Sequence, residues 1–270
     1  MLDALEFNTI LVDVDQSTGV VTITFNRPDV RNALNREMAE ELRAALGMLR
    51  DIPTCRVLIF TGSGERAFMS GADIAQMKER DRSHAFLRIN TTLFHDIEQF
   101  PHPTIAAIRG YALGGGCEIA LACDLRVAGT SAVLGQPEVG LGILPAAGGC
   151  YRLPKLVGLG RAKELIYTGR LVKADEALAL GMVESLVPDD DVMDEAHRLA
   201  NAIAANSQVA VRMAKMMLNN QSEMSTAVAM ALESTGQAIL YEDPEKHERM
   251  GAFLEKRAAR RAAREAKDKS

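Results

Sequence analysis

Two segments of this chain share one pattern: an apolar run that predicts a buried strand, then a glycine-containing turn, then the start of a helix. The first covers residues 55–61 (CRVLIFT) and 68–74 (FMSGADI), and the second covers residues 104–109 (TIAAIR) and 110–121 (GYALGGGCEIAL). A largely apolar run is typical of a strand that is covered on both faces, as in a parallel sheet. Strands that alternate with helices in this way predict an α/β fold.

Other segments extend this region in both directions. Residues 9–15 and 20–26 alternate between apolar and polar side chains, which predicts a hairpin, and Asn35 is expected to cap a helix that ends near Arg50. The further elements expected are a helix from about Ala72, a helix over residues 82–100, a turn over 110–116, a short helix over 117–123, and short strands over 125–128 and 132–134.

The pattern changes beyond about Val187. Four helices and no strand are predicted there, over residues 190–205, 207–219, 222–241 and 244–267. We therefore expect an α/β core over residues 1–188 and a helical portion over residues 189–270. Because no low-complexity linker separates the two, the helical portion is expected to pack on the core or on a neighbouring subunit.

Composition and charge argue against several classes of protein. The 270 residues carry a net charge of −5, whereas phosphate binding needs a basic surface, so nucleic acid is not expected as a partner. The four cysteines include no CxxC pair and the five histidines no HExxH, so no metal or redox site is expected. A signal peptide and a run of ~18 apolar residues are also lacking. We therefore expect a cytoplasmic protein with reduced thiols and no membrane partner.

The two glycine turns can present backbone N–H groups to a ligand. The first turn of a helix leaves N–H groups unpaired at the positive end of its dipole, where an anion or a developing oxyanion can bind. Gly114, Gly115 and Gly116 would let the backbone approach such a group without a Cβ in the way. Alternatively, each turn is only a strand-to-helix connection. Neither turn carries a dinucleotide or Walker motif, which argues against a nucleotide phosphate loop.

Glu118 stands alone among apolar residues of the predicted helix, three residues after Gly115. That spacing places its side chain near the side to which the N–H groups of the turn point. A carboxylate in apolar surroundings is costly unless it has a function or a partner. Glu118 is therefore either a reactive group or the partner of an arginine such as Arg126 or Arg152.

Glu138 is a second carboxylate in an apolar segment, GQPEVGLGILPAAGG over residues 135–149. It could cap a helix or a loop. If it lies near Glu118 and the N–H groups, however, the two acids suit general acid–base chemistry. Burial and mutual repulsion then raise a carboxyl pKa toward the working pH.

Taken together, these segments resemble the enoyl-CoA hydratase/isomerase (crotonase) superfamily over most of the chain. The resemblance is carried by residues 26–35 (NRPDVRNALN), 67–74 (AFMSGADI), 110–124 (GYALGGGCEIALACD), 135–149 and 250–257 (MGAFLEKR). It implies a crotonase-like (ClpP/crotonase) fold, a spiral of repeated ββα units with a C-terminal all-helical portion that forms trimers or dimers of trimers.

The resemblance also implies a reaction and a set of roles. The thioester carbonyl of a 2-enoyl-CoA would accept hydrogen bonds from the N–H groups of Ala72 and Gly115. Glu118 would act as base on the water, and Glu138 would supply the proton to C2. The enzyme would be a hydro-lyase that needs no cofactor, because coenzyme A is part of the substrate. The residues implied to bind the substrate are Arg31, Ala33, Leu34, Ser70, Gly71, Asp73, Ile74, Tyr111, Gly114, Pro137, Ala146, Phe253 and Lys256.

Two other functions stay open at this level. A Δ3,Δ2-enoyl-CoA isomerase or another acyl-CoA lyase could use the same fold, although an isomerase usually needs one acid, so the pair Glu118 and Glu138 favours hydration. A non-catalytic CoA-binding or RNA-binding scaffold is the alternative of another class. The chain departs from the hydratase pattern at Ala146, where a glycine is usual. Alanine keeps the N–H group but restricts φ and adds a methyl group.

Overall fold

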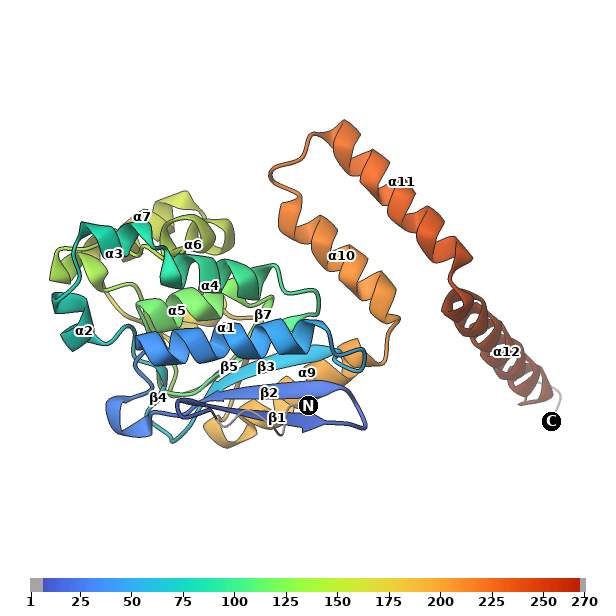
Figure 1. Ribbon diagram of the computed structural model, residues 1–270. Helices are drawn as coiled ribbons and strands as arrows, with labels where there is room; N and C mark the ends of the chain where they lie inside the picture. The colour runs from blue at the N-terminus through green and yellow to red at the C-terminus, as the bar shows by residue number, and fades with distance from the viewer. Residues whose placement is uncertain (1–6, 268–270) are drawn as a thin grey trace. The chain divides into compact units, whose positions relative to one another are not determined.

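The computed structural model describes residues 7–267, and the chain divides into two compact units between Ala205 and Asn206. The first unit is an α/β structure, and the described part of the second contains helices α10 to α12 (Figure 1). None of the described helices is long and apolar enough to span a membrane.

A six-stranded sheet forms the centre of the first unit, with strand order β1-β2-β3-β5-β7-β10. β1 pairs antiparallel with β2, and the other neighbours are parallel. A second, four-stranded sheet has the order β4-β6-β8-β9. The strands of the first sheet are β1 Ile10–Asp15, β2 Val20–Phe25, β3 Val57–Gly62, β5 Thr104–Ile108, β7 Leu125–Gly129 and β10 Ser185–Val187. Those of the second are β4 Ala67–Met69, β6 Tyr111–Leu113, β8 Val133–Gly135 and β9 Val172–Lys173.

The chain passes between the two sheets three times in succession. β3, β5 and β7 of the large sheet lead into β4, β6 and β8 of the small sheet, and each pair is followed by a helix or helical turn. The expected repeat of ββα units is therefore confirmed. The helices that follow are α2 Ile74–Lys78, α5 Gly115–Ala122 and the 3₁₀ turn η3 Glu138–Leu141.

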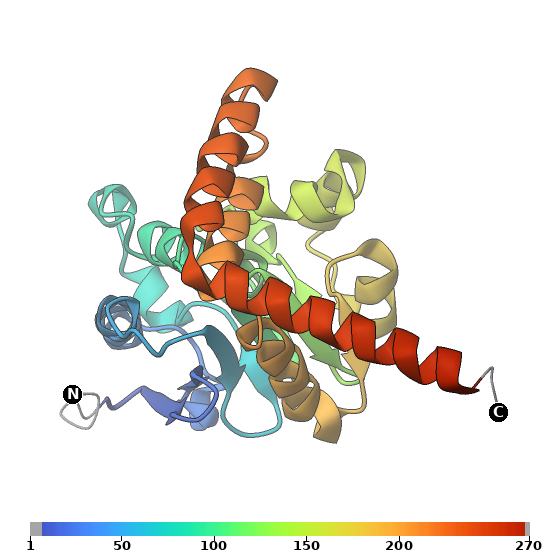
Figure 2. The same ribbon diagram turned by 90° about the vertical axis from the view of Figure 1, so that its right-hand side faces the viewer.

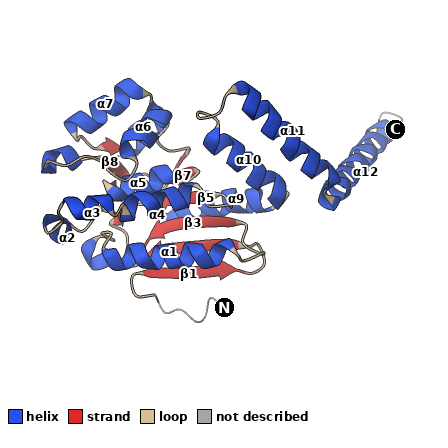
Figure 3. Cartoon of the chain, turned by 45° about the horizontal axis from the view of Figure 1, so that its top comes forward, coloured by secondary structure: helices blue, strands red, loops and turns tan. Residues whose placement is uncertain are grey.

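Both faces of the large sheet are covered, which explains its apolar strands. Leu58 and Phe60 of β3 pack in the cluster that includes α1 (Arg36–Arg50), α4 (Ile89–Glu98) and α5. Val57 and Ile59 point to the other face and pack against α9 (Val192–Ala204). Figure 3 shows α1 and α4 lying over the red strands of the sheet. The boundary expected near residue 188 lies before α9, whereas the two compact units divide after α9, because this helix packs on the sheet.

Two local expectations were wrong. The helix expected over residues 82–100 is two helices, α3 (Arg82–Phe86) and α4, because Arg88 adopts a left-handed conformation with φ 52°. The turn expected over residues 110–116 contains β6, which pairs with β4 and β8, and the start of α5. The helix expected from about Ala72 is confirmed as α2, which begins at Ile74 and is capped by the side chain of Asp73.

The second unit consists of three described helices. They are α10 Gln208–Asn220, α11 Thr226–Glu242 and α12 Pro244–Lys267, and α12 leaves the end of α11 at an angle (Figure 2). The remaining elements of the first unit are η2 Pro28–Val30, α6 Gly149–Val157, α7 Leu159–Thr168, α8 Ala174–Leu180 and η4 Asp189–Asp191.

The contact between α5 and β4 leaves no room for a side chain at Gly116. A Cβ atom at this position would lie 2.0 Å from the carbonyl oxygen of Met69. We expect Gly116→Ala to lower the free energy of unfolding by about 3 kcal/mol, since helix and strand would have to separate. Gly47→Ala is the control. Gly47 lies within α1 with no atom near an added Cβ, so alanine should raise the same quantity by about 0.5–1 kcal/mol. Similar values for both variants in chemical denaturation would contradict the close contact.

Candidate active site

The two glycine turns bring the backbone of Ala72 and Gly115 side by side. β4 and β6 are parallel neighbours, so the turns that follow them lie at the same edge of the small sheet. A Cβ placed on Gly115 would lie 3.7 Å from the nitrogen of Ala72, and one placed on Gly71 would lie 3.9 Å from the nitrogen of Gly115. The structure therefore joins the two turns that the sequence singled out.

The N–H groups of Ala72 and Gly115 remain available to a ligand. On either side of Ala72 the backbone is paired, because Leu34 N–H donates to the Gly71 carbonyl at 2.8 Å and Asp73 N–H donates to the Leu34 carbonyl at 2.9 Å. Within residues 7–267, neither the Ala72 nor the Gly115 N–H donates a backbone hydrogen bond. Two adjacent free donors form a geometry that can stabilise an oxyanion.

Glu118 lies one turn along α5 and is only 4% exposed. Its Oε1 accepts hydrogen bonds from the N–H groups of Ala147 at 2.7 Å and Gly149 at 2.9 Å. Burial raises the pKa of Glu118, while these two N–H groups and the positive charge of Arg152 act to lower it. The carboxylate is thus buried but held by the backbone.

The alternative that Glu118 pairs with an arginine is wrong within the described part of the chain. The guanidinium of Arg152 donates to Glu98 at 2.8 Å. That of Arg126 pairs with Glu184 and also donates to the Cys123 carbonyl at 2.8 Å, near the end of α5. Both arginines support the elements around Glu118 without forming an ion pair with it.

Glu138 begins η3 and lies beside the same turn. A Cβ placed on Gly114, whose φ is 51°, would lie 3.1 Å from Oε1 of Glu138. Burial, followed by the negative charge of Glu118, raises the pKa of Glu138 to about 7. The two glutamates predicted from sequence thus lie close to each other and to Gly115. The position of Glu138 is therefore explained without the alternative role of a helix or loop cap.

Gln136 is a site residue that the sequence analysis missed. It is 1% exposed, and with its amide nitrogen turned toward the carboxylate it donates to both oxygens of Glu138, at 3.0 and 3.2 Å. A buried amide two residues from a buried acid is consistent with a positioning role. The only signal in the sequence was a polar residue in an otherwise apolar segment.

Asn32 was also missed, and it organises the turn that contains Arg31 and Ala33. Its side chain is fully buried and donates to the carbonyls of Ser63 at 3.0 Å and Ala67 at 2.8 Å. Its φ of 56° lies in the left-handed region, which asparagine tolerates better than most residues. Asn32 thereby ties this turn to β4.

The residues implied to bind substrate fall into four groups. The turn at Arg31 joins the Ser70 turn directly, since Ser70 N–H donates to the Arg31 carbonyl at 3.0 Å. Tyr111 begins β6, at the end of the strand away from Gly115. Gly71, Asp73, Ile74, Gly114, Pro137 and Ala146 belong to the segments that surround the two N–H groups and the glutamates. Phe253 and Lys256 lie on α12 in the second unit, and their role in the site stays a prediction.

Ala146 fits its position without backbone strain. It is not among the described residues with positive φ, so no glycine-specific conformation is required there. It is exposed, and its carbonyl accepts a hydrogen bond from the hydroxyl of Thr91 at 3.0 Å. The departure from the usual glycine therefore keeps the backbone N–H group available.

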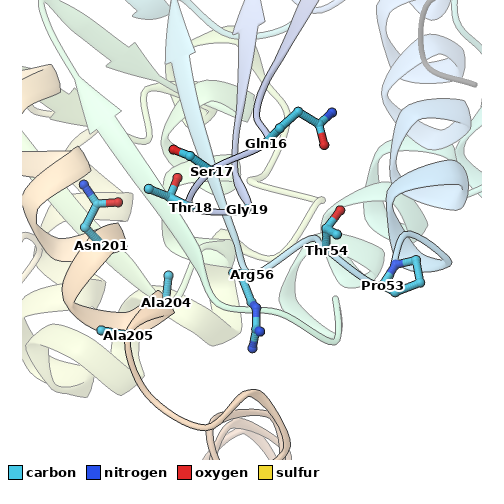
Figure 4. Close-up of a pocket in the computed structure, with 10 residues that line it drawn as sticks. All are labelled: Gln16, Ser17, Thr18, Gly19, Pro53, Thr54, Arg56, Asn201, Ala204 and Ala205. Atoms are coloured by element: carbon cyan, nitrogen blue, oxygen red, sulfur yellow. The ribbon is translucent and has the colours of Figure 1, made fainter.

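A pocket at the end of the large sheet where β2 and β3 begin is lined by none of the site residues described above (Figure 4). It lies where the β1–β2 turn meets the end of α9, at the amino ends of β2 and β3. Ligands of parallel sheets bind at the carboxyl ends of the strands. Its lining residues are Gln16, Ser17, Thr18, Gly19, Pro53, Thr54, Arg56, Asn201, Ala204 and Ala205.

Comparison with known proteins agrees with this geometry. The family model "Enoyl-CoA hydratase/isomerase" matches residues 15–262. The short-chain-enoyl-CoA hydratase of Clostridium acetobutylicum is 42% identical, covering 94% of this chain and 97% of that protein. The crotonyl-CoA hydratase of Syntrophomonas wolfei is 40% identical over 94% of this chain and 98% of its own length. A crystal structure of enoyl-CoA hydratase from Bacillus anthracis matches with a TM-score of 0.88 and 40% identity, covering 92% and 97% of the two chains.

The raised pKa of Glu138 should make the folded state less stable at alkaline pH. Between its usual value of 4.5 and its folded value of about 7, the folded protein binds more protons than the unfolded chain, so the free energy of unfolding falls as pH rises. Glutamine cannot ionise and removes this fall. The quantity to compare is the free energy of unfolding of Glu138→Gln minus that of the parent protein. We expect this difference to be about 2 kcal/mol more positive at pH 8 than at pH 5. The same difference at both pH values in urea denaturation would refute the raised pKa.

Proposed function

This chain belongs to the enoyl-CoA hydratase/isomerase family, and from that premise we propose that it adds water across the 2,3-double bond of a 2-enoyl-CoA thioester. The observation that carries the proposal is the position of Glu118 and Glu138, which lie together beside the free N–H groups of Ala72 and Gly115. Two acids next to an oxyanion site suit addition of water better than a proton shuttle, for which one acid suffices.

The proposed reaction uses the two N–H groups to polarise the thioester carbonyl. They would donate hydrogen bonds to its oxygen, which makes C3 electrophilic and stabilises the negative charge that develops when C3 is attacked. As the water oxygen bonds to C3, Glu118 takes one of its protons. The electron pair of the double bond moves through C2 onto the thioester oxygen. When the carbonyl forms again, C2 takes the proton of Glu138, and the product is a 3-hydroxyacyl-CoA.

The surroundings of the two acids suit these roles. Glu118 accepts two backbone N–H bonds, which hold its carboxyl group in place to take a proton from water and oppose the rise of its pKa that burial causes. Glu138 has a pKa of about 7, so about half of it carries a proton near neutral pH, as an acid requires. After one turnover the protonated Glu118 and ionised Glu138 exchange protons with solvent.

The proposal extends to cofactor, assembly and location. Catalysis would need no metal or redox group, and coenzyme A would enter and leave with the acyl chain. The trimer or dimer of trimers is proposed because helices α10 to α12 expose many large apolar side chains. These are Val209, Met216, Leu218, Val228, Met230, Leu232, Ile239, Tyr241, Met250, Phe253 and Leu254. A cytoplasmic location stays a prediction.

The hydratase assignment predicts that crotonyl-CoA is consumed. Addition of water removes the conjugation between the double bond and the thioester, so absorbance in the enoyl-thioester band should fall when protein is added. Longer 2-enoyl-CoA substrates should be tested in parallel, together with a 3-enoyl-CoA to detect isomerase activity. If no 2-enoyl-CoA is consumed, the hydratase proposal is wrong.

Glu118→Gln should separate catalysis from binding. Glutamine preserves the size of the side chain and one acceptor oxygen but cannot take the proton of water, so kcat for hydration should fall about 10²- to 10⁴-fold. The dissociation constant for coenzyme A, measured by calorimetry, should change less than about twofold. Glu65→Gln, at an exposed position, is the control and should change neither quantity. Equal losses of turnover and binding in Glu118→Gln would indicate a structural role.

A further inference from the structure

We propose that Thr91 is a positioning residue for Glu118, acting through the peptide unit that joins Ala146 to Ala147. The inference rests on the proposed function in that it assigns Glu118 a role in turnover. It concerns a helix, α4, that contributes none of the residues expected to contact substrate.

One peptide unit connects Thr91 to Glu118. The hydroxyl of Thr91 donates to the Ala146 carbonyl at 3.0 Å. The N–H of Ala147 donates to Oε1 of Glu118 at 2.7 Å. This carbonyl and this N–H belong to the same planar group, in which a trans peptide points them in opposite directions. A bond that fixes the carbonyl therefore also fixes the direction of the N–H that holds Glu118.

The next peptide unit is held from the same helix. The guanidinium of Arg152 donates to the Ala147 carbonyl at 3.0 Å and to Glu98 at 2.8 Å. Glu98 lies seven residues after Thr91, which is two turns of α4, so both side chains lie on one side of the helix. Arg152 is 2% exposed. α4 thus anchors consecutive carbonyls of the turn, directly through Thr91 and indirectly through Arg152.

The turn needs such anchors because regular secondary structure does not hold it. Residues 143–145 have no assigned structure, and residues 146–148 form a turn before α6. Gly148, with φ 124°, has no Cβ to limit its backbone. In such a segment the peptide planes can rotate unless other groups bind them. The Thr91 hydroxyl supplies one such bond, to the Ala146 carbonyl, next to the Ala147 N–H group that donates to Glu118.

The test removes the hydroxyl without changing the shape of the side chain. We expect Thr91→Val to lower kcat for hydration about 5- to 20-fold and to change KM less than about twofold, because a lost neutral hydrogen bond misplaces the base but leaves the binding groups intact. Thr91→Ser keeps a hydroxyl and should restore most of kcat. Thr92→Val is the matched control, since Thr92 is the exposed neighbour in α4 and no side-chain hydrogen bond is found for it within residues 7–267.

A second measurement does not depend on turnover. Thr91→Val should speed hydrogen exchange of the Ala147 amide, measured by NMR, whereas Thr92→Val should leave it as in the parent protein. The inference is overturned if Thr91→Val changes neither kcat nor this exchange rate, or if Thr91→Ser fails to restore them. A parent protein without hydratase activity would instead refute the proposed function, and the exchange rate would still decide the positioning role.

Discussion

The parallel pairing of β4 with β6 determines where the reactive groups of this molecule lie. Two short strands that run in one direction place the turns after them at the same edge, so Ala72 and Gly115 become neighbours although they lie 43 positions apart in the sequence. α5 then starts at this edge, and the absence of a side chain at Gly116 lets the helix contact Met69 directly. Glu118 follows one turn later, and its place is a consequence of where α5 begins.

Burial raises the pKa of both glutamates, but different groups bind them. Every residue of α5 is buried, so an ionised Glu118 would be costly without the N–H groups of Ala147 and Gly149. Glu138 is bound by the side-chain amide of Gln136 and by its own backbone N–H group, and it also experiences the negative charge of Glu118. The two N–H groups at Glu118 oppose the rise of its pKa, whereas the negative charge of Glu118 adds to the rise at Glu138. Different surroundings of this kind allow two carboxyl groups in one site to take different roles.

The sequence predicted those parts of the structure that depend on local patterns. Helix α1 was predicted from Asn35, a residue type that caps helices. Strand β3, which is covered on both faces, was predicted from its apolar run. The break between α3 and α4 at Arg88 was not predicted, because no local sequence pattern marks an arginine in the left-handed conformation. Strand β6 was hidden in a glycine-rich segment, since its pairing depends on partners distant in sequence. The partners of the buried arginines, and the role of Gln136, likewise depend on contacts that form only in the folded chain.

Ala146 illustrates how a departure from a family pattern is best judged. From sequence alone, alanine in place of glycine restricts φ and adds a methyl group. The first effect has no consequence, because the φ of Ala146 is not positive. The second is limited by the exposed position of this residue. What matters is the peptide group, whose carbonyl is bound by Thr91 and whose other end, at Ala147, binds Glu118. Because any residue other than proline retains the backbone N–H group, alanine preserves both the N–H group of residue 146 and the carbonyl that Thr91 binds.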